Sequence, residues 1–317
     1  MSKELFVERS FKPATLRLIE TANEIIAEYQ DLGFTLTLRQ LYYQFVARDV
    51  LPNKQSEYKR LGSIVNDARL AGLLDWTAIE DRTRNVRTSP AWTSPEDVMR
   101  AVADQYQENP WLSQQARPEL WIEKDALIGV IEPVCQRMRV PYFACRGYAS
   151  QSEIYSAGKR FAAHRRQGLR PIVYHLGDHD PSGVDMTRDN RDRLSMFARR
   201  GVEVVRLGLN WDQVEEYDPP PNPAKETDSR AGAELEDGSF TPGSYRDLYG
   251  ESSWELDALD PTVIDGLIQS ALDEIIDNDD RAGWNAALDQ EAERKVGLDR
   301  AATRWDEVAA FLAGEDG

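Results

Sequence analysis

Three acidic side chains stand where two predicted strands end. Glu123 closes the apolar run LWIE, and Asp178 and Asp180 follow the apolar run IVYHLG. Because alternate residues of a strand share a face, an Asp-x-Asp pair directs both carboxylates to one side, and the intervening His179 should point away as a packed or solvent-facing imidazole. Carboxylate oxygens suit Mg²⁺. An Asp-x-Asp pair alone is also typical of a turn and helix cap, but Glu123 on a separate strand favours a metal site.

A second group of residues that could take part in a reaction is Arg39-Gln-Leu-Tyr42-Tyr43, inside a predicted helix. The two tyrosines point about 100° apart, so only one of them can face a given cleft. Arg39 lies one helical turn before them, on the neighbouring surface. A tyrosine that attacks a phosphate needs a nearby cation to stabilise the charge that develops, and Arg39 could supply it. The alternative is that both tyrosines pack in a core with their hydroxyls at its rim.

The tyrosines belong to the second of three helices that apolar spacing predicts at residues 13–30, 38–49 and 55–72. Three short helices followed by a small extended tail are typical of a winged helix-turn-helix domain, whose third helix enters a DNA groove. A small helical bundle with a solvated basic surface is the alternative. The predicted DNA contacts are the cations of the third helix and of the run that follows it: Lys59, Arg60, Arg69, Arg82 and Arg84.

From residue 118 onward, predicted strands alternate with predicted helices, which indicates a mainly parallel, Rossmann-like sheet. Ligands of such sheets bind at the carboxyl ends of the strands, where Glu123 and the Asp178/Asp180 pair fall. We expect a long loop at 212–250 and an acidic helical region after it. The expected domains are 1–90, a linker at 91–117, and an α/β domain at 118–317 that includes these C-terminal segments.

Together these motifs resemble the topoisomerase VI A subunit and the related meiotic double-strand-break transesterase. The matching stretches are Arg39-Gln-Leu-Tyr42-Tyr43, LWIEKDAL, GDHDPSG and, less closely, CRGYAS and WELDAL. The resemblance covers roughly residues 35–260. It implies a winged-helix tyrosine domain followed by a Toprim domain, with Tyr43 as nucleophile, Arg39 beside it, and Glu123, Asp178 and Asp180 as ligands of Mg²⁺ or of Mn²⁺ in its place.

The implied activity is cleavage of double-stranded DNA through a 5′-phosphotyrosyl link. The resemblance further implies a homodimer in which Tyr43 of one protomer meets the metal of the other. Whether a B-type ATPase subunit exists as a partner is not decided by the sequence. One alternative is a Toprim nuclease that hydrolyses DNA with metal-activated water and no tyrosine, in which Glu255 and Asp257 complete a second metal site. Another is a DNA-binding protein without catalysis.

Charge is distributed unevenly along the chain. The 317 residues carry a formal charge of −17, yet residues 1–200 sum to +3 and residues 201–317 to −20. The net negative charge of the whole chain argues against a nucleic-acid partner, but the small positive charge of residues 1–200, which hold the candidate residues, does not. The run HRRQGLR, with His164, Arg165, Arg166 and Arg170, could contact phosphates or form a solvated helix end. With two cysteines and neither apolar span nor leader, we expect a cytoplasmic, nucleoid-associated protein without membrane contact.

Overall fold

The computed structural model describes residues 3–79, 89, 91–224, 228, 230–235 and 237–314. The chain divides into two compact units. The first comprises Met1–Arg84 and Pro118–Leu272, and the second comprises Asn85–Arg117 and Asp273–Gly317. Among the described residues, no helix combines the length and the apolar character that crossing a bilayer requires.

Three N-terminal helices form where the apolar spacing predicted them. They are α1 (Pro13–Asp31), α2 (Leu38–Ala47) and α3 (Gln55–Leu70). Thr37 begins α2 with a reciprocal capping box: its hydroxyl accepts from the amide of Gln40, and the Gln40 side chain accepts from the Thr37 amide. Ile25, Leu41 and other side chains of the three helices share one buried core. Packing of these faces, more than helix propensity, therefore fixes where α2 presents Arg39 and Tyr43.

The wing of the expected winged helix is not shown by the structure. In the described part of this region, the extended segments contribute only isolated bridges, Leu36 with Ile79 and Leu5 with Ala71. The residues that should form the following tail, including Arg82 and Arg84, lie outside the described residues. Three packed helices are what the structure supports, and the winged helix stays a prediction.

The predicted parallel sheet is present and has four strands in the order β2-β1-β3-β4. Strand β1 pairs in parallel with β2, and β3 pairs in parallel with β4. The strands are β1 (Ala116–Ile122), β2 (Tyr142–Ala144), β3 (Arg170–Leu176) and β4 (Glu203–Gly208). Strands β1 and β3 are buried along nearly their whole length, as expected of the central strands of a covered sheet. The fold is thus α/β and Rossmann-like.

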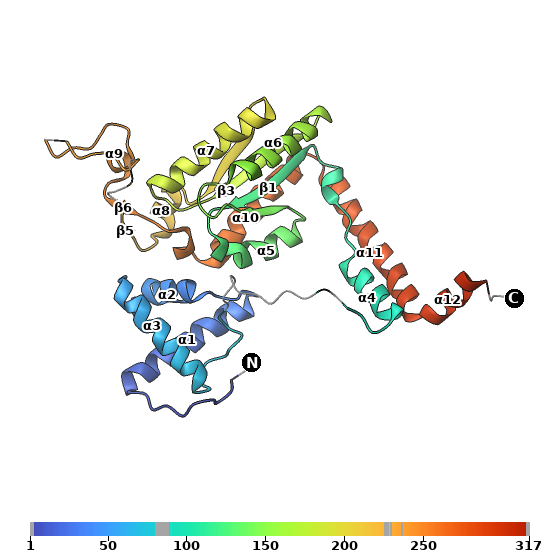
Figure 1. Ribbon diagram of the computed structural model, residues 1–317, viewed down its shortest axis with the longest axis horizontal. Helices are drawn as coiled ribbons and strands as arrows, with labels where there is room; N and C mark the ends of the chain where they lie inside the picture. The colour runs from blue at the N-terminus through green and yellow to red at the C-terminus, as the bar shows by residue number, and fades with distance from the viewer. Residues whose placement is uncertain are drawn as a thin grey trace. The chain divides into compact units, whose positions relative to one another are not determined.

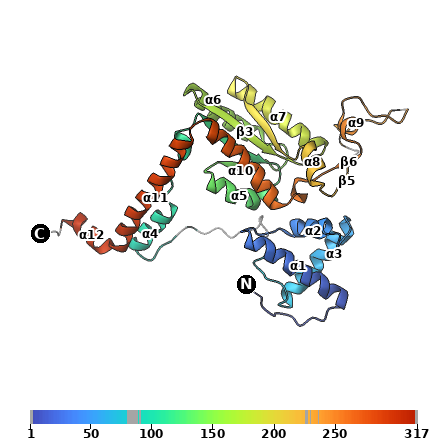
Figure 2. The ribbon, with the colours of Figure 1, turned by 180° about the vertical axis from the view of Figure 1, so that it is seen from behind.

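Helices cover both faces of this sheet. Figures 1 and 2 show α6 and α7 on one side of the strands and α5 and α10 on the other. Their bounds are α5 (Ile128–Arg137), α6 (Gln151–Arg166), α7 (Pro181–Ala198) and α10 (Pro261–Asn278), and a 3₁₀ turn, η2 (Asp125–Leu127), precedes α5. Helices α6 and α7 approach closely at Gly158, where a Cβ would lie 2.6 Å from Cβ of Phe197. This pair of helices is therefore tightly packed side by side.

The stretch between β4 and α10 contains more regular structure than the expected loop at 212–250. It holds α8 (Trp211–Tyr217), α9 (Tyr245–Tyr249), a short antiparallel pair of β5 (Asn222–Pro223) with β6 (Ser252–Ser253), and the 3₁₀ turn η3 (Leu256–Ala258). Four aromatic rings of this stretch surround His179: Trp211, Tyr245, Tyr249 and Trp254. His179 is therefore packed rather than solvent-facing, and this packing orders the segment that carries Glu255.

The second unit is helical. It contains α4 (Pro95–Gln105), the 3₁₀ turn η1 (Pro110–Leu112), α11 (Arg281–Thr303) and α12 (Trp305–Ala313), which brings the α-helices of the described residues to twelve. Trp111 packs edge-on against Trp284 at 5.0 Å, and the Glu291 carboxylate accepts from the Glu108 amide at 2.8 Å. Residues 91–117, expected to link two domains, therefore pack with the acidic C-terminal helices.

Candidate active site

The carboxyl ends of β1 and β3 bring Glu123 and Asp178 together. The Glu123 amide donates to the Leu176 carbonyl at 2.8 Å, and the Asp178 amide donates to Oε2 of Glu123 at 3.0 Å. Burial raises the pKa of Glu123 to about 7, and the negative charges of Asp178 and Asp180 add to the rise. Asp178 and Asp180 are therefore both close enough to Glu123 for their charges to affect its ionisation.

The two aspartates of the Asp-x-Asp pair have different partners. Asp178 is buried, and its Oδ1 accepts from the amide of Leu256 at 2.8 Å. Asp180 is the N-cap of α7, where its Oδ1 accepts from the amide of Gly183 at 2.6 Å. Asp180 therefore makes the helix cap that the sequence offered as the alternative to a metal ligand.

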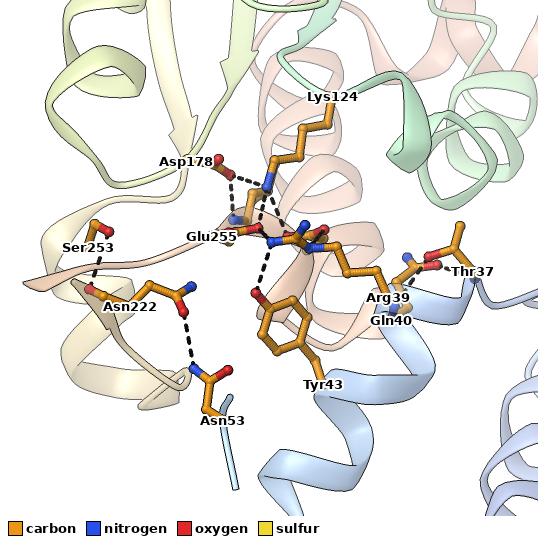
Figure 3. Close-up of polar contacts among 12 residues, drawn as sticks. Thr37, Arg39, Gln40, Tyr43, Asn53, Lys124, Asp178, Asn222, Ser253 and Glu255 are labelled. Atoms are coloured by element: carbon orange, nitrogen blue, oxygen red, sulfur yellow. Dashed lines mark hydrogen bonds and ion pairs between the residues drawn. The ribbon is translucent and has the colours of Figure 1, made fainter. Parts of the chain in front are cut away.

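Lys124 occupies the centre of an acidic cluster (Figure 3). Its Nζ lies 3.0 Å from Asp178 Oδ1, 2.8 Å from Glu255 Oε2 and 3.0 Å from Asp257 Oδ1. Burial works against the Lys124 charge, but the carboxylates of Asp257, Asp178 and Glu255 outweigh it and raise the Lys124 pKa. We call Lys124, Asp178, Glu255 and Asp257 the lysine-centred cluster.

Arg39 connects this cluster to Tyr43. Its guanidinium pairs with Glu255 and, at 3.1 Å, with Oδ2 of Asp257, which is 3% exposed. The same guanidinium donates to the Tyr43 hydroxyl at 3.3 Å. In Figure 3, Tyr43 and Arg39 reach from α2 toward Glu255, while Lys124 approaches from the sheet. One continuous polar network therefore joins the candidate nucleophile to the strand ends.

The local environment makes the Tyr43 hydroxyl a weak acid. Tyr43 is only 3% exposed, and burial raises the pKa of its hydroxyl. The carboxylate of Asp257 raises this pKa further, whereas the Arg39 guanidinium lowers it. Arg39 is thus the cation that favours the phenolate form of Tyr43 in this site.

Tyr42 has a structural role. Its hydroxyl donates toward the carbonyls of Pro52 and Lys54 at 3.0 and 3.1 Å, and accepts from the Lys54 amide at 2.8 Å. These bonds tie α2 to the turn before α3. Of the two adjacent tyrosines, Tyr43 is the one whose hydroxyl lies in the polar network, and its role as nucleophile stays a prediction.

A buried arginine fastens the loop that carries the aspartates. The guanidinium of Arg206, on β4, donates to the carbonyls of Gly177, Gly183 and Asp178 at 3.0, 2.7 and 2.6 Å. Burial lowers the Arg206 pKa to about 10, although the nearby carboxylates oppose this shift. The loop is also sterically tight, because a Cβ at Gly183 would collide with the carbonyl oxygen of Asp178. Both features hold the two aspartates in place.

The donor chemistry of the site fits Mg²⁺, but its arrangement is not that of a ready ligand set. Within the described ranges, no three or more His, Cys, Asp or Glu side chains are placed to hold one ion together. The available groups are nevertheless carboxylate oxygens, and the charges of Asp178 and Asp180 raise the Glu123 pKa although the Lys124 charge acts in the opposite direction. Lys124 forms its direct ion pairs with the neighbouring Asp178, Glu255 and Asp257.

The predicted DNA contacts on α3 differ in their exposure to solvent. Lys59 and Arg60 are exposed on α3, and Arg60 pairs with Glu57 one turn earlier. Arg69 turns inward: it donates to the carbonyls of Trp76 and Ile79, and its guanidinium lies over the Trp76 ring. Lys59 and Arg60 are therefore available to a ligand, whereas Arg69 braces the chain that follows α3.

Two residues of the site were missed from the sequence. Lys124 directly follows the predicted ligand Glu123, and this adjacency was the one available signal for it. Nothing in the sequence indicated the role of Arg206, because the stretch GVEVVRLGL around it indicated only a strand. Glu255 and Asp257 were noted through a similar motif and as a second metal site of the hydrolytic alternative, and the structure brings both to Lys124.

Among known proteins, no protein-family model matches the chain, and no curated protein matches it.

Proposed function

We propose that this protein is a Mg²⁺-dependent enzyme that cleaves double-stranded DNA in the manner of the topoisomerase VI A subunit, acting as a homodimer. The observation that supports it is the contact of Arg39 with both the Tyr43 hydroxyl and the acids Glu255 and Asp257. A nucleophile, a guanidinium and a set of carboxylates at the ends of parallel strands are the parts that phosphoryl transfer needs.

In the proposed step, the Tyr43 oxygen attacks a DNA phosphorus and loses its proton. The bond from phosphorus to the 3′ oxygen breaks, and that oxygen leaves and takes up a proton, so that the 5′ phosphate remains on Tyr43. Arg39 would stabilise both the phenolate and the charge on the phosphate. Glu123, Asp178 and Asp180 would hold Mg²⁺, which would supply Lewis-acid stabilisation of the leaving oxygen.

Hydrolysis without a covalent intermediate is the second candidate function. The burial of Tyr43 and the raised pKa of its hydroxyl favour it, because both oppose formation of the attacking phenolate. A hydrolytic enzyme would use the same acids and would treat Tyr43 as a packing residue.

Plasmid cleavage separates these two functions. Supercoiled DNA would be incubated with the protein and Mg²⁺ or Mn²⁺, with and without protease before electrophoresis. We expect protease-dependent release of linear DNA, complete loss of protein–DNA adducts in Tyr43→Phe, and retained adducts in the matched control Tyr42→Phe. Cutting by Tyr43→Phe at the rate of the unaltered protein would reject the transesterase and support hydrolysis.

A further inference from the structure

A basic hollow lies at the other ends of the strands. It has a volume of about 580 Å³ and is formed by the last turns of α6 and α7 and by the residues after α7. Five cations line it: Lys159, Arg165, Arg166, Arg199 and Arg200. We call this feature the basic hollow. In a chain of net charge −17, such a concentration of cations is unexpected on composition alone.

These cations are not neutralised by nearby acids. Among the described residues, none of the five forms an ion pair with Asp or Glu, although Arg165 donates to the carbonyl of Gly201. Glu203, the acid nearest in sequence to Arg200, pairs with Arg170, and Glu119 pairs with Arg160. The hollow therefore presents uncompensated positive charge to solvent.

Helix dipoles alone do not account for the arrangement. Cations in a last turn are favourable near the negative end of a helix, which would explain Arg165 and Arg166. Lys159 lies about two turns before the end of α6, beyond the reach of that effect. Arg199 ends α7 in the left-handed conformation with φ of +58°, a position that glycine occupies with less strain.

Aromatic rings adjoin the same surface. Tyr155 lies one turn before Lys159 on α6 and is 49% exposed; the Lys159 ammonium stands 5.2 Å from its ring centroid. Its ring packs edge-on against Phe197, a residue that lines the hollow. Cations beside an exposed aromatic ring suit nucleic acid better than they suit an acidic protein surface.

We propose that the basic hollow is a second DNA-binding site, which holds backbone phosphates away from the lysine-centred cluster. The seven residues of β3 separate the two, which corresponds to about 20 Å along the strand. A duplex advances about 3.4 Å per base pair, so the two sites lie roughly six base pairs apart. The proposal rests on DNA as the ligand of the proposed function, though not on its cleavage.

Binding in the absence of metal tests it. A labelled 30-base-pair duplex would be titrated with the full chain in EDTA, by fluorescence anisotropy, at several salt concentrations between 50 and 200 mM. The test variant combines Arg166→Ala, Arg199→Gly and Arg200→Ala, and it keeps Arg165 because of its bond to Gly201. The control removes the same charge from ion-paired arginines elsewhere, as Arg48→Ala, Arg137→Ala and Arg304→Ala.

We expect the test variant to bind DNA at least ~10-fold more weakly, and its salt dependence to flatten by about three units of slope if each cation contacts a phosphate. The control should bind within twofold of the unaltered protein. The test variant should keep the melting temperature of the unaltered protein, which would show that lost binding is not lost folding, and Arg199→Gly alone should leave that temperature unchanged or raise it.

Equal affinity and equal salt slope in the test and control variants would overturn the proposal. It would also be overturned if the test variant lost binding to phosphatidylserine vesicles but kept its affinity for the duplex, since the hollow would then serve an anionic surface of another kind. A protein that binds DNA through the hollow yet never cuts it would support this site while removing the proposed cleavage.

Discussion

Lys124 is the residue that sets the character of the candidate site. It places one positive charge between three carboxylates that would otherwise repel one another at short range. Two of these acids, Asp178 and Asp257, are buried, so neither can be compensated by water. Lys124 therefore acts as a built-in counter-ion, and a divalent ion brought to this edge of the sheet would share the acids with it.

Replacing Lys124 by methionine tests whether Lys124 compensates the charges of these carboxylates. We expect Lys124→Met to lower the free energy of unfolding by about 3 kcal/mol without divalent metal, because buried carboxylates lose their partner. Added Mg²⁺ should raise the melting temperature of the variant more than that of the unaltered protein. Thermal unfolding with and without Mg²⁺ measures both, with the exposed Lys59→Met as control, and an unchanged melting temperature would contradict this role.

At the scale of elements, helix α7 and the candidate metal site share Asp180. The side chain caps α7 through the Gly183 amide, and its charge also acts on Glu123. A cap needs only a side-chain oxygen, whereas a metal ligand of this kind needs a carboxylate. The two roles are therefore separable by substitution.

Two changes at Asp180 should separate them. Asp180→Asn keeps the capping oxygen, so its stability should stay within a few tenths of a kcal/mol, while Mg²⁺ binding and cleavage should fall. Asp180→Ala should additionally lose about 1 kcal/mol of stability. Denaturant unfolding and calorimetric Mg²⁺ titration give the two readouts. Unimpaired Mg²⁺ binding in Asp180→Asn would leave the residue as a cap alone.

Strand β3 carries a histidine that should make the fold acid-sensitive. Burial lowers the pKa of His175 to about 3, and its Nδ1 lies 2.8 Å from the Thr187 hydroxyl. The unfolded chain takes up a proton near pH 6.5 and the folded chain does not, so His175 destabilises the fold as pH falls from about 6.5 toward 3.

The slope of that loss is about 1.4 kcal/mol per pH unit at its steepest. His175→Leu should remove it while keeping a buried apolar volume, and Thr187 would retain its bond from Arg206. Urea unfolding of both proteins between pH 7 and pH 4 measures the difference. Parallel pH profiles would show that His175 does not cause the acid sensitivity.

Periodicity in the sequence predicted most elements, because helices and buried strands depend on nearby residues. Thr37, for example, predicted the start of α2 because threonine is a favourable N-cap residue. The contacts of Lys124 with Glu255 and Asp257 could not be predicted in this way, since more than 130 residues separate them. The bonds from Arg206 to Asp178 and Gly183 likewise depend on the finished turn, which no local pattern encodes.

At the scale of the whole molecule, the question is whether one chain or two complete the site. The resemblance to the topoisomerase VI A subunit implies that Tyr43 acts on the metal of a partner. In the single chain, however, Arg39 already joins Tyr43 to Glu255 and Asp257 of the same chain. This contact favours a site completed within each protomer of the proposed homodimer.

Mixing two inactive proteins distinguishes the arrangements. We expect an equimolar mixture of Tyr43→Phe and Asp178→Ala to remain inactive in plasmid cleavage after subunit exchange, because no protomer then holds both groups. Each variant alone and a mixture of one variant with the unaltered protein serve as controls. Recovery of up to about a quarter of the unaltered activity would instead show that Tyr43 works across the dimer.

The collision that any side chain at Gly183 would make with the Asp178 carbonyl has a consequence for finding relatives of this protein. An aspartate can be exchanged for another oxygen donor while the backbone keeps its path, but the turn itself admits only glycine at this point. The spacing Gly177-Asp178-x-Asp180-x-x-Gly183 is thus a steric signature as well as a chemical one. A search for distant homologues should therefore weight the second glycine as heavily as the aspartates, because the glycine is required by the shape of the loop.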